Sequence, residues 1–275
     1  RAQGEIYFRY RILSAPFALT NFCILGWFIG QGRAAIAFVV QIFLNIVNMA
    51  LGAWFVLSLG MTADGVGLSA LIAEISAVLL GAVLIWRSFH RMKARATWAQ
   101  IWNREKVMRT LTANGDIMIR TLCLVFAFTW FTARGARAGD VTIAANAVLL
   151  HFFEVAAYLI DGFAYASEAL VGQSVGAKNR ARFRQAIRLT TLWALVVGAI
   201  CSAIIWFAGP WFIDLMTVNA EVRETARHFL FWAALTPLLG TICFQFDGIF
   251  TGAMATRDMR NMMVLSLLIY LAAWW

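Results

Sequence analysis

Long apolar stretches recur along the whole chain at intervals of about thirty residues. A helix needs about 20 consecutive apolar residues to cross a bilayer, whereas the strands of a membrane barrel are half as long and alternate in polarity. Because most stretches reach the helical length and the mean hydropathy is +0.75, we predict an all-α polytopic membrane protein. The stretches cover residues 12–30, 34–58, 66–86, 111–133, 141–165, 186–208, 228–252 and 261 to the end.

The two ends of the sequence suggest a piece of a longer chain. The last apolar stretch stops at Trp275 after about 15 residues, which is fewer than a full crossing requires. The sequence starts at Arg1, without an initiator Met or the pattern of a signal peptide. We therefore expect a fold that is truncated at both ends.

The net charge of +9 follows from membrane topology. If the connections between spans alternate sides, 15 of the 23 Lys and Arg residues lie on one side and seven on the other, while Arg120 lies within a span. The positive-inside rule assigns the richer side to the cytoplasm. We therefore predict a multi-pass membrane protein, with the lipid bilayer and no nucleic acid as a partner.

The long polar segment 87–110 divides the spans into two groups. Residues 1–86 are predicted to form part of an amino-terminal lobe with three spans, and 111–275 part of a carboxy-terminal lobe with five, the last incomplete. Within the linker, Trp98, Ile101 and Trp102 can share one helical face, which is typical of a helix lying in the cytoplasmic membrane interface.

A weak internal repeat favours two related halves. The pattern Gly-x-Phe-x-Gly ends one span at Gly26–Gly30 and another at Gly248–Gly252, 222 residues later. Both copies follow a proline and precede an arginine and a further span. Parallel repeats of this kind are common in transporters.

The segment 151–170 carries carboxylates at intervals of seven, namely Glu154, Asp161 and Glu168. On a helix, all its strongly polar groups fall within about 100° of arc. A charge at the bilayer centre costs about 2.5–3.5 kcal/mol on insertion scales, so such a stripe is predicted to face a bundle interior or a water-filled cavity. The remaining members of the stripe are His151, Tyr158 and Tyr165.

Two roles are open for these carboxylates. They can exchange a proton or hold Na⁺, or they can fix helix packing by capping backbone groups or pairing with Arg. Asp161 and Glu154 are candidates for ion coupling. Glu168 approaches the basic loop and is also a candidate partner of Lys178 or Arg180.

Other spans carry single polar groups. Asp247 stands alone near the middle of its span, which makes it a third candidate for ion coupling. Asp116 and Arg120, spaced i and i+4, are predicted to pair and neutralise each other. Glu74 lies at the middle of its span as well. A further polar face of one helix consists of Gln41, Asn45, Asn48 and Gly52. The amide side chains of its Gln and Asn residues can line a cavity or bridge helices.

No signature of an enzyme is found in the sequence. It contains no metal-ligand spacing of His and Cys, no Gly-x-Ser-x-Gly motif and no phosphate-binding loop. We expect no catalytic residues, no metal site and no cofactor apart from H⁺ or Na⁺ as a coupling ion.

Several long motifs resemble the multidrug and toxic compound extrusion (MATE) family, specifically its DinF-like branch. They are YLIDGFAYASEALVGQSVGAKNRARFRQAI (158–187), NGDIMIRTL (114–122), FQFDGIFTGAMATRDMRNMM (244–263), PFALTNFCILGWFIG (16–30) and LNIVNMALGAWFVLSLG (44–60). The resemblance implies twelve helices in two six-helix lobes around a central cavity, of which this chain would be helices 4 to 11. It also implies export of substrates against H⁺ or Na⁺.

The resemblance also assigns site residues. Asn21 and Asn48 would belong to the polar site of the amino lobe, whereas Asp247 in FQFDG and Asp161 would match acidic positions of the carboxy lobe. The chain departs from the family at the motif Asn-x-x-Leu-Asp, which reads NMALG here and leaves Gly52 in place of the acid.

We therefore expect a monomeric secondary transporter that exports small organic or cationic compounds by alternating access. Asn21, Asn45, Asn48, Tyr158, Asp116 and Arg120 are the candidates for polar groups of its cavity. A flippase for lipids or lipid-linked precursors, with related two-lobe architecture, is the main alternative. A membrane-embedded enzyme and a non-transporting scaffold are further alternatives.

Overall fold

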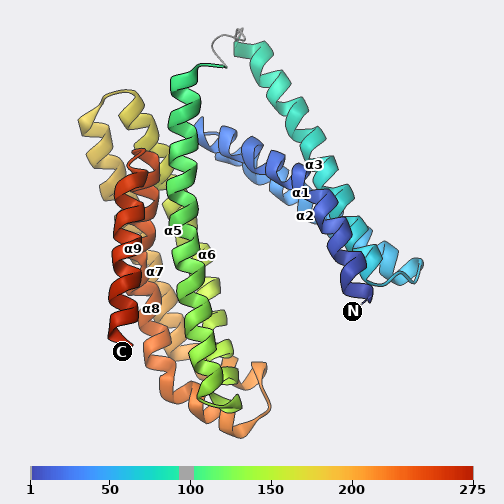
Figure 1. The fold of residues 1–275 in the computed structure, drawn as a ribbon, viewed down its shortest axis with the longest axis vertical. Coiled ribbons are helices and arrows are strands. Elements are labelled where there is room, and N and C mark those ends of the chain that lie inside the picture. Colours follow the sequence, from blue (N-terminus) through green and yellow to red (C-terminus); the bar gives the residue numbers. More distant parts are fainter. Residues whose placement is uncertain (1, 93–101, 275) are drawn as a thin grey trace. The chain divides into compact units, whose positions relative to one another are not determined.

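The computed structural model describes residues 2–92 and 102–274, and these residues form helices joined by short turns (Figure 1). The prediction of an all-α fold is thereby confirmed. Seven of the described helices are long and apolar enough to cross a membrane. Each contains one of the first seven predicted stretches but extends beyond it at one or both ends, except that the helical segment 34–58 has the predicted bounds.

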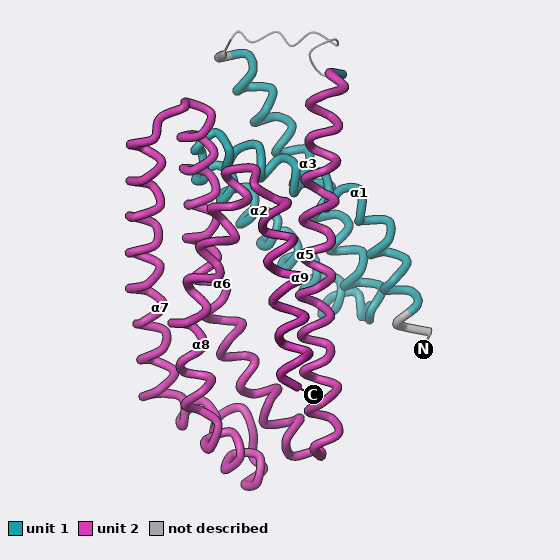
Figure 2. The backbone as a smooth tube through the Cα atoms, turned by 60° about the vertical axis from the view of Figure 1, so that its left-hand side comes forward, with its two compact units in different colours: residues 1–102 teal, residues 103–275 magenta. Residues whose placement is uncertain are grey.

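The chain forms two compact units, residues 1–102 and 103–275, which Figure 2 colours separately. The boundary falls inside the segment 87–110. The interfacial helix expected there lies largely outside the described residues, because residues 93–101 are not among them.

The first unit contains α1 (Ala2–Gly30), α2 (Ala34–Ala53), the short π-helix η1 (Trp54–Ser58) and α3 (Ala63–Met92). Helix α3 packs against both α1 and α2. Glycines of α3 allow the closest approach to α1: a Cβ on Gly81 would overlap the side chain of Ile24, and a Cβ on Gly67 that of Tyr10.

The second unit contains α5 (Arg104–Arg137), α6 (Asp140–Gly176), α7 (Arg180–Met216), α8 (Ala220–Gly252) and α9 (Thr256–Ala273). Helices α6, α7 and α8 pack against one another, whereas α5 packs mainly on α9. The apolar core of the unit lies among α6, α7 and α8. Its buried members include Ala145, Ala156, Cys201, Ile205, Ile213, Ala226 and Leu230.

Three helices of the second unit, α5, α7 and α8, start with an asparagine cap. The side chain of Asn103 accepts hydrogen bonds from two amides at the start of α5, and Asn179 and Asn219 do the same for one amide of α7 and two of α8. An Asx oxygen satisfies amide groups that have no partner inside the helix. The helices therefore begin in polar segments that hydropathy alone leaves out.

Both copies of the Gly-x-Phe-x-Gly repeat end a helix at their second glycine, Gly30 in α1 and Gly252 in α8. The following turns have matching hydrogen bonds, and the second residue after each helix has a positive φ, 73° at Gly32 and 57° at Met254. The same turn also ends α6, with Lys178 at φ 51°. The turn therefore agrees with the repeat but is not specific to it.

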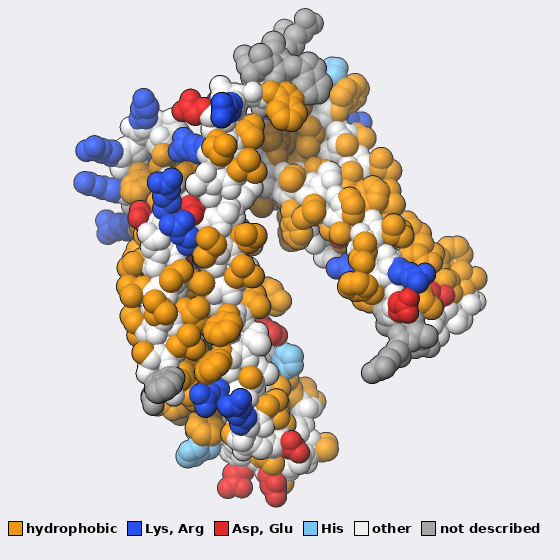
Figure 3. Space-filling model, in the orientation of Figure 1, with side chains coloured by type: hydrophobic (Ala, Val, Ile, Leu, Met, Phe, Trp, Pro, Cys, Tyr) orange, Lys and Arg blue, Asp and Glu red, His pale blue; other side chains and the backbone are white. Residues whose placement is uncertain are grey.

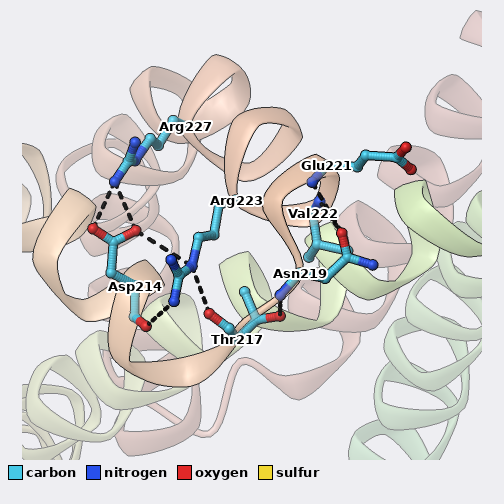
Figure 4. A network of polar contacts seen from close by, with 7 residues as sticks. All are labelled: Asp214, Thr217, Asn219, Glu221, Val222, Arg223 and Arg227. Carbon is cyan, nitrogen blue, oxygen red and sulfur yellow. Dashed lines mark hydrogen bonds and ion pairs between the residues drawn. The ribbon is translucent and has the colours of Figure 1, made fainter.

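An ion-pair network closes the turn between α7 and α8 (Figure 4). Arg227 donates from Nη2 to both carboxylate oxygens of Asp214 at 2.6 Å. Arg223 donates to the carbonyl oxygens of Thr217 at 2.6 Å and Asp214 at 2.8 Å. The two arginines of α8 thereby hold the last carbonyl groups of α7 and fix the turn between the two helices.

The surface has the distribution that a membrane protein requires. Hydrophobic side chains cover the long sides of the helices in both units, and Lys and Arg gather at the end of the second unit where α6 meets α7 (Figure 3). The exposed basic residues there are Lys178, Arg180, Arg182, Arg184 and Arg188.

Candidate functional site

An ion pair lies within the membrane-spanning part of the second unit. Nη2 of Arg120, on α5, is 2.7 Å from Oδ1 of Asp247, on α8, and their side chains are 22% and 33% exposed. Asp247, the single mid-span acid of α8, is thus paired with a residue of another helix. The predicted pair of Asp116 with Arg120 is wrong, because each of the two residues pairs elsewhere.

Two further carboxylates lie near this pair. Asp161, on α6, interacts electrostatically with both Asp247 and Arg120, and Glu168 interacts with Asp247. Tyr165, between them on α6, interacts electrostatically with the same charges. Three helices therefore bring together three carboxylates and one guanidinium, which we call the acidic cluster: Arg120, Asp161, Glu168 and Asp247.

The close approach of α6 and α8 assembles this cluster. A Cβ on Gly248 would overlap the backbone of Ala164, and a Cβ on Gly252 that of Glu168. Gly248 directly follows Asp247, so the approach that it allows brings Asp247 towards α6. In addition, Nε of Arg120 is buried and has no hydrogen-bond partner among the described residues.

Asp116 belongs to a separate, buried contact between α5 and α9. Its side chain is 3% exposed, accepting a hydrogen bond from Nη1 of Arg260 at 2.6 Å and another from the Thr256 hydroxyl at 2.9 Å. Both carboxylate oxygens are hydrogen-bonded to α9, and the role of Asp116 as a polar group of a cavity stays a prediction. An open pocket of about 860 Å³ adjoins it, between the first turns of α5 and the turn that joins α8 to α9.

The other end of the carboxylate stripe is exposed in the second unit. Glu154 pairs with His151 at 3.2 Å, and Tyr158 is 76% exposed. Neither lies in the interior of the bundle of α6, α7 and α8; whether they line a cavity stays a prediction. Among the described residues Glu168 forms no ion pair, so the suggested pairing with Lys178 or Arg180 is wrong.

In the first unit, Asn21 and Glu74 form a contact between α1 and α3. Nδ2 of Asn21 donates to the Glu74 carboxylate at 2.5 Å and to its backbone carbonyl oxygen at 3.1 Å. Asn21 is 4% exposed. The sequence placed both residues at mid-span, but no pattern in it indicated that they meet.

The other polar face of the first unit is divided. Asn48, on α2, accepts a hydrogen bond from the buried hydroxyl of Ser69, on α3, at 3.1 Å. A Cβ on Gly52 would also meet that hydroxyl, at 3.4 Å. Asn45 is exposed, and the first unit as described gives it no hydrogen-bond partner. Only one amide of this face therefore bridges two helices.

No group of three His, Cys, Asp or Glu residues in the part of the chain that the structure describes is arranged to hold a metal ion. Three membrane-spanning carboxylates have partners of another kind: Asp116 and Asp247 each pair with a guanidinium, and Glu74 accepts from an amide. Such pairs can change partners when a proton or another cation neutralises the carboxylate.

Comparison with known proteins identifies relatives along most of the chain. It is 33% identical over 264 residues to DNA damage-inducible protein F of Escherichia coli, which covers 96% of this chain and 58% of that protein. It is 20% identical over 252 residues to Protein DETOXIFICATION 44, chloroplastic, of Arabidopsis thaliana, covering 92% of this chain and 47% of the relative. The chain thus spans about half the length of the curated relatives it matches.

Solved structures share the fold. A crystal structure of MATE in the straight conformation superposes with a TM-score of 0.87 at 18% identity, covering 96% of this chain and 59% of that one. The outward-facing conformation of a multidrug resistance MATE family transporter of the MOP superfamily gives 0.82, also at 18% identity and with the same coverage. The predicted MATE-like, multi-pass fold is confirmed.

The MatE family model matches residues 117–273, more than half of the chain. This family is one of transporters, in agreement with the expectation that the chain is not an enzyme. With the motif-based resemblance, the helical fold and the relative from Escherichia coli all in agreement, the chain belongs to the MatE (multidrug and toxic compound extrusion) family.

Proposed function

We propose that the intact protein exports small organic compounds, cationic ones among them, across the bacterial inner membrane in exchange for H⁺ or Na⁺. It does so as a monomer by alternating access. Family membership supports a transporter, and the relative in Escherichia coli supports the membrane. The flippase alternative is not favoured, because Arg120, the mid-span cation that could bind a lipid phosphate, is paired with Asp247.

The observation that carries the ion coupling is the charge of the acidic cluster. Three carboxylates, Asp161, Glu168 and Asp247, stand against the single guanidinium of Arg120 in the acidic cluster, so the ionised cluster carries an excess of negative charge within a membrane-spanning unit. Uncompensated charge at this depth costs several kcal/mol. A proton, Na⁺ or an organic cation lowers that cost by entering the cluster.

Binding of the cation couples to conformation if the two states of the transporter bind it with different affinity. Arg120 supplies the difference. When Asp247 is neutralised its attraction for the guanidinium falls, and Arg120 is free to turn to Asp161, on another helix. An external cation and Arg120 therefore compete for the Asp247 carboxylate, so that binding of the cation and retention of the Arg120–Asp247 pair exclude each other.

The experiment uses the full-length protein in proteoliposomes loaded with a panel of cationic dyes. A pH gradient and a Na⁺ gradient are imposed separately. Asp247→Asn is expected to reduce gradient-driven export at least tenfold at unchanged expression, because the neutral amide no longer attracts a cation.

Asp214→Asn is the matched control. It also removes an ion-paired aspartate of the second unit, but at the turn between α7 and α8 and outside the acidic cluster. Export by this variant is expected to stay within twofold of the parent. Normal gradient-driven export by Asp247→Asn would contradict the proposed coupling site.

A further inference from the structure

Lys and Arg side chains form a basic patch where α6 ends and α7 begins (Figure 3). No Asp or Glu occurs between residues 169 and 213, and no side chain of the patch forms an ion pair with any described residue. The patch therefore carries uncompensated positive charge. Its exposed members are Lys178, Arg180, Arg182, Arg184 and Arg188.

The placement of these charges is unfavourable for the helix that carries most of them. Arg180, Arg184 and Arg188 follow one another at intervals of four, and like charges at this spacing repel. The first turn of α7 contains no acidic residue, although the amino-terminal end of a helix favours negative charge. The positive-inside rule explains cations on this side of the membrane but not their arrangement in one row. A negatively charged partner that lies on the row offsets both penalties.

The same row continues into the apolar part of α7. Residues spaced by four form a ridge on the surface of a helix. After the three arginines, this ridge consists of the exposed side chains of Leu192, Val196 and Ile200. The helix rises about 12 Å from Leu192 to Ile200, which is close to the about 15 Å of hydrocarbon in one leaflet of a bilayer. One ridge thus has a charged end followed by an apolar part about as long as a lipid chain.

The ridge faces away from the core of the second unit. The other side of α7 is buried, with Ala186, Thr190 and Ala194 among its packed residues. Trp193, beside the ridge, is 57% exposed and lies about 7.5 Å along the helix from Arg188. Trp side chains gather at the level of the lipid headgroups. The boundary between headgroups and hydrocarbon therefore falls where the arginines of the ridge give way to apolar side chains.

We propose that this ridge of α7 binds an anionic phospholipid of the cytoplasmic leaflet. Arg184 and Arg188 hold the phosphate of the headgroup, since a guanidinium can donate two parallel hydrogen bonds to phosphate oxygens. An acyl chain lies on the apolar part of the ridge. A soluble anion matches only the charged end, whereas a phospholipid matches the whole ridge. The lipid site does not depend on the proposed export.

The test is native mass spectrometry of the purified full-length protein in detergent with equal amounts of phosphatidylglycerol and phosphatidylcholine. The parent protein is expected to retain phosphatidylglycerol in preference. Because a basic residue next to an anionic membrane surface contributes about fivefold to binding, the double variant Arg184→Gln/Arg188→Gln should lower this preference roughly tenfold or more. Arg184→Lys/Arg188→Lys should keep most of the preference, since both charges remain.

Arg104→Gln/Arg109→Gln is the matched control. It removes two exposed arginines of α5, which the positive-inside rule places on the same side of the membrane but which have Glu105 beside them. Its lipid preference should stay within about twofold of the parent, since these arginines lie outside the ridge. An equal loss in both double variants would overturn the proposal, because net charge alone would then explain the preference. Displacement of phosphatidylglycerol by glycerol phosphate would overturn it as well, since the site would then take a soluble anion.

The repulsion within the row gives a second measurement, which is the Tm with and without lipid. In detergent alone, Arg184→Gln should have a Tm equal to or above that of the parent, because it removes the repulsion from both neighbours in the row. Phosphatidylglycerol should raise the Tm of the parent more than that of Arg184→Gln, since a ligand stabilises the folded state that binds it. The same rise in both proteins, or a lower Tm of the variant in detergent alone, would contradict the lipid site.

Discussion

The contact of Gly248 with α6 gives a quantitative prediction. A Cβ added at Gly248 would overlap the carbonyl oxygen, the carbonyl carbon and the Cα of Ala164. These are backbone atoms of a helix and cannot rotate away as a flexible side chain can. The substitution Gly248→Ala therefore forces α6 and α8 apart.

The magnitude follows from a matched comparison. Overpacking in a well-packed interior costs about 1–3 kcal/mol. Alanine also gains about 0.5–1 kcal/mol over glycine inside a helix. Gly162→Ala, on α6, has the same gain without the overlap, because no atom lies within 4 Å of its Cβ position. Gly248→Ala should therefore be less stable than Gly162→Ala by about 1–3 kcal/mol.

The assay is thermal unfolding of the purified full-length variants in detergent, followed by tryptophan fluorescence. Because about 1 kcal/mol shifts the Tm of a large domain by about 2–4 °C, the two variants should differ by several degrees. Equal Tm values for the two variants would refute the argument that the backbones of α6 and α8 are in contact at Gly248.

Two further predictions concern the α8–α9 region. Asp116→Asn should destabilise the protein by on the order of 2 kcal/mol, because it leaves the partly exposed Arg260 without its carboxylate. The exposed Asp258→Asn is the control, and an equal Tm for both variants would contradict the role of the pair. Met254→Gly should raise stability by up to about 1 kcal/mol, since Met254 has a φ of 57°. Met262→Gly, in the interior of α9, should instead lower it by about 1 kcal/mol; a loss of Tm in Met254→Gly would count against strain at the turn.

Hydropathy was sufficient to predict the helices but not their full length. A span must be apolar, and the first seven stretches each lie in a helix that is long and apolar enough to cross a membrane, while the eighth lies in α9. A helix, however, needs only its own backbone hydrogen bonds and a suitable end, so α7 and α8 start at residues capped by Asn179 and Asn219, well before their apolar parts. The helix ends were therefore the least predictable feature of the fold.

The pairing of charges could not be predicted for a related reason. Arg120 lies within a span and requires an acidic partner. Local spacing favours Asp116, which lies one turn away in the same helix. The structure instead pairs Arg120 with Asp247 and Asp116 with Arg260, each from another helix. Which helices meet depends on their packing, and a single sequence contains no direct signal of it.

The intervals of seven in the carboxylate stripe follow from the packing of α6. Ile160 and Ser167 are buried in that helix, and Asp161 and Glu168 each directly follow one of them. The two carboxylates therefore lie about 100° round the helix from the packed face. The acids border the contact with α8 instead of entering it, which is why they remain half-buried.

This arrangement links helix packing to the charge of the acidic cluster. Asp247 directly precedes the buried Gly248, so the glycine that brings α8 close to α6 also brings Asp247 close to Asp161. Arg120 offsets the resulting repulsion from α5. If α6 and α8 separate, the repulsion between Asp161 and Asp247 falls, and the affinity of the acidic cluster for a cation falls with it. A cation that binds the close arrangement more tightly than the separated one will shift the equilibrium between them, as any ion-coupled conformational change requires.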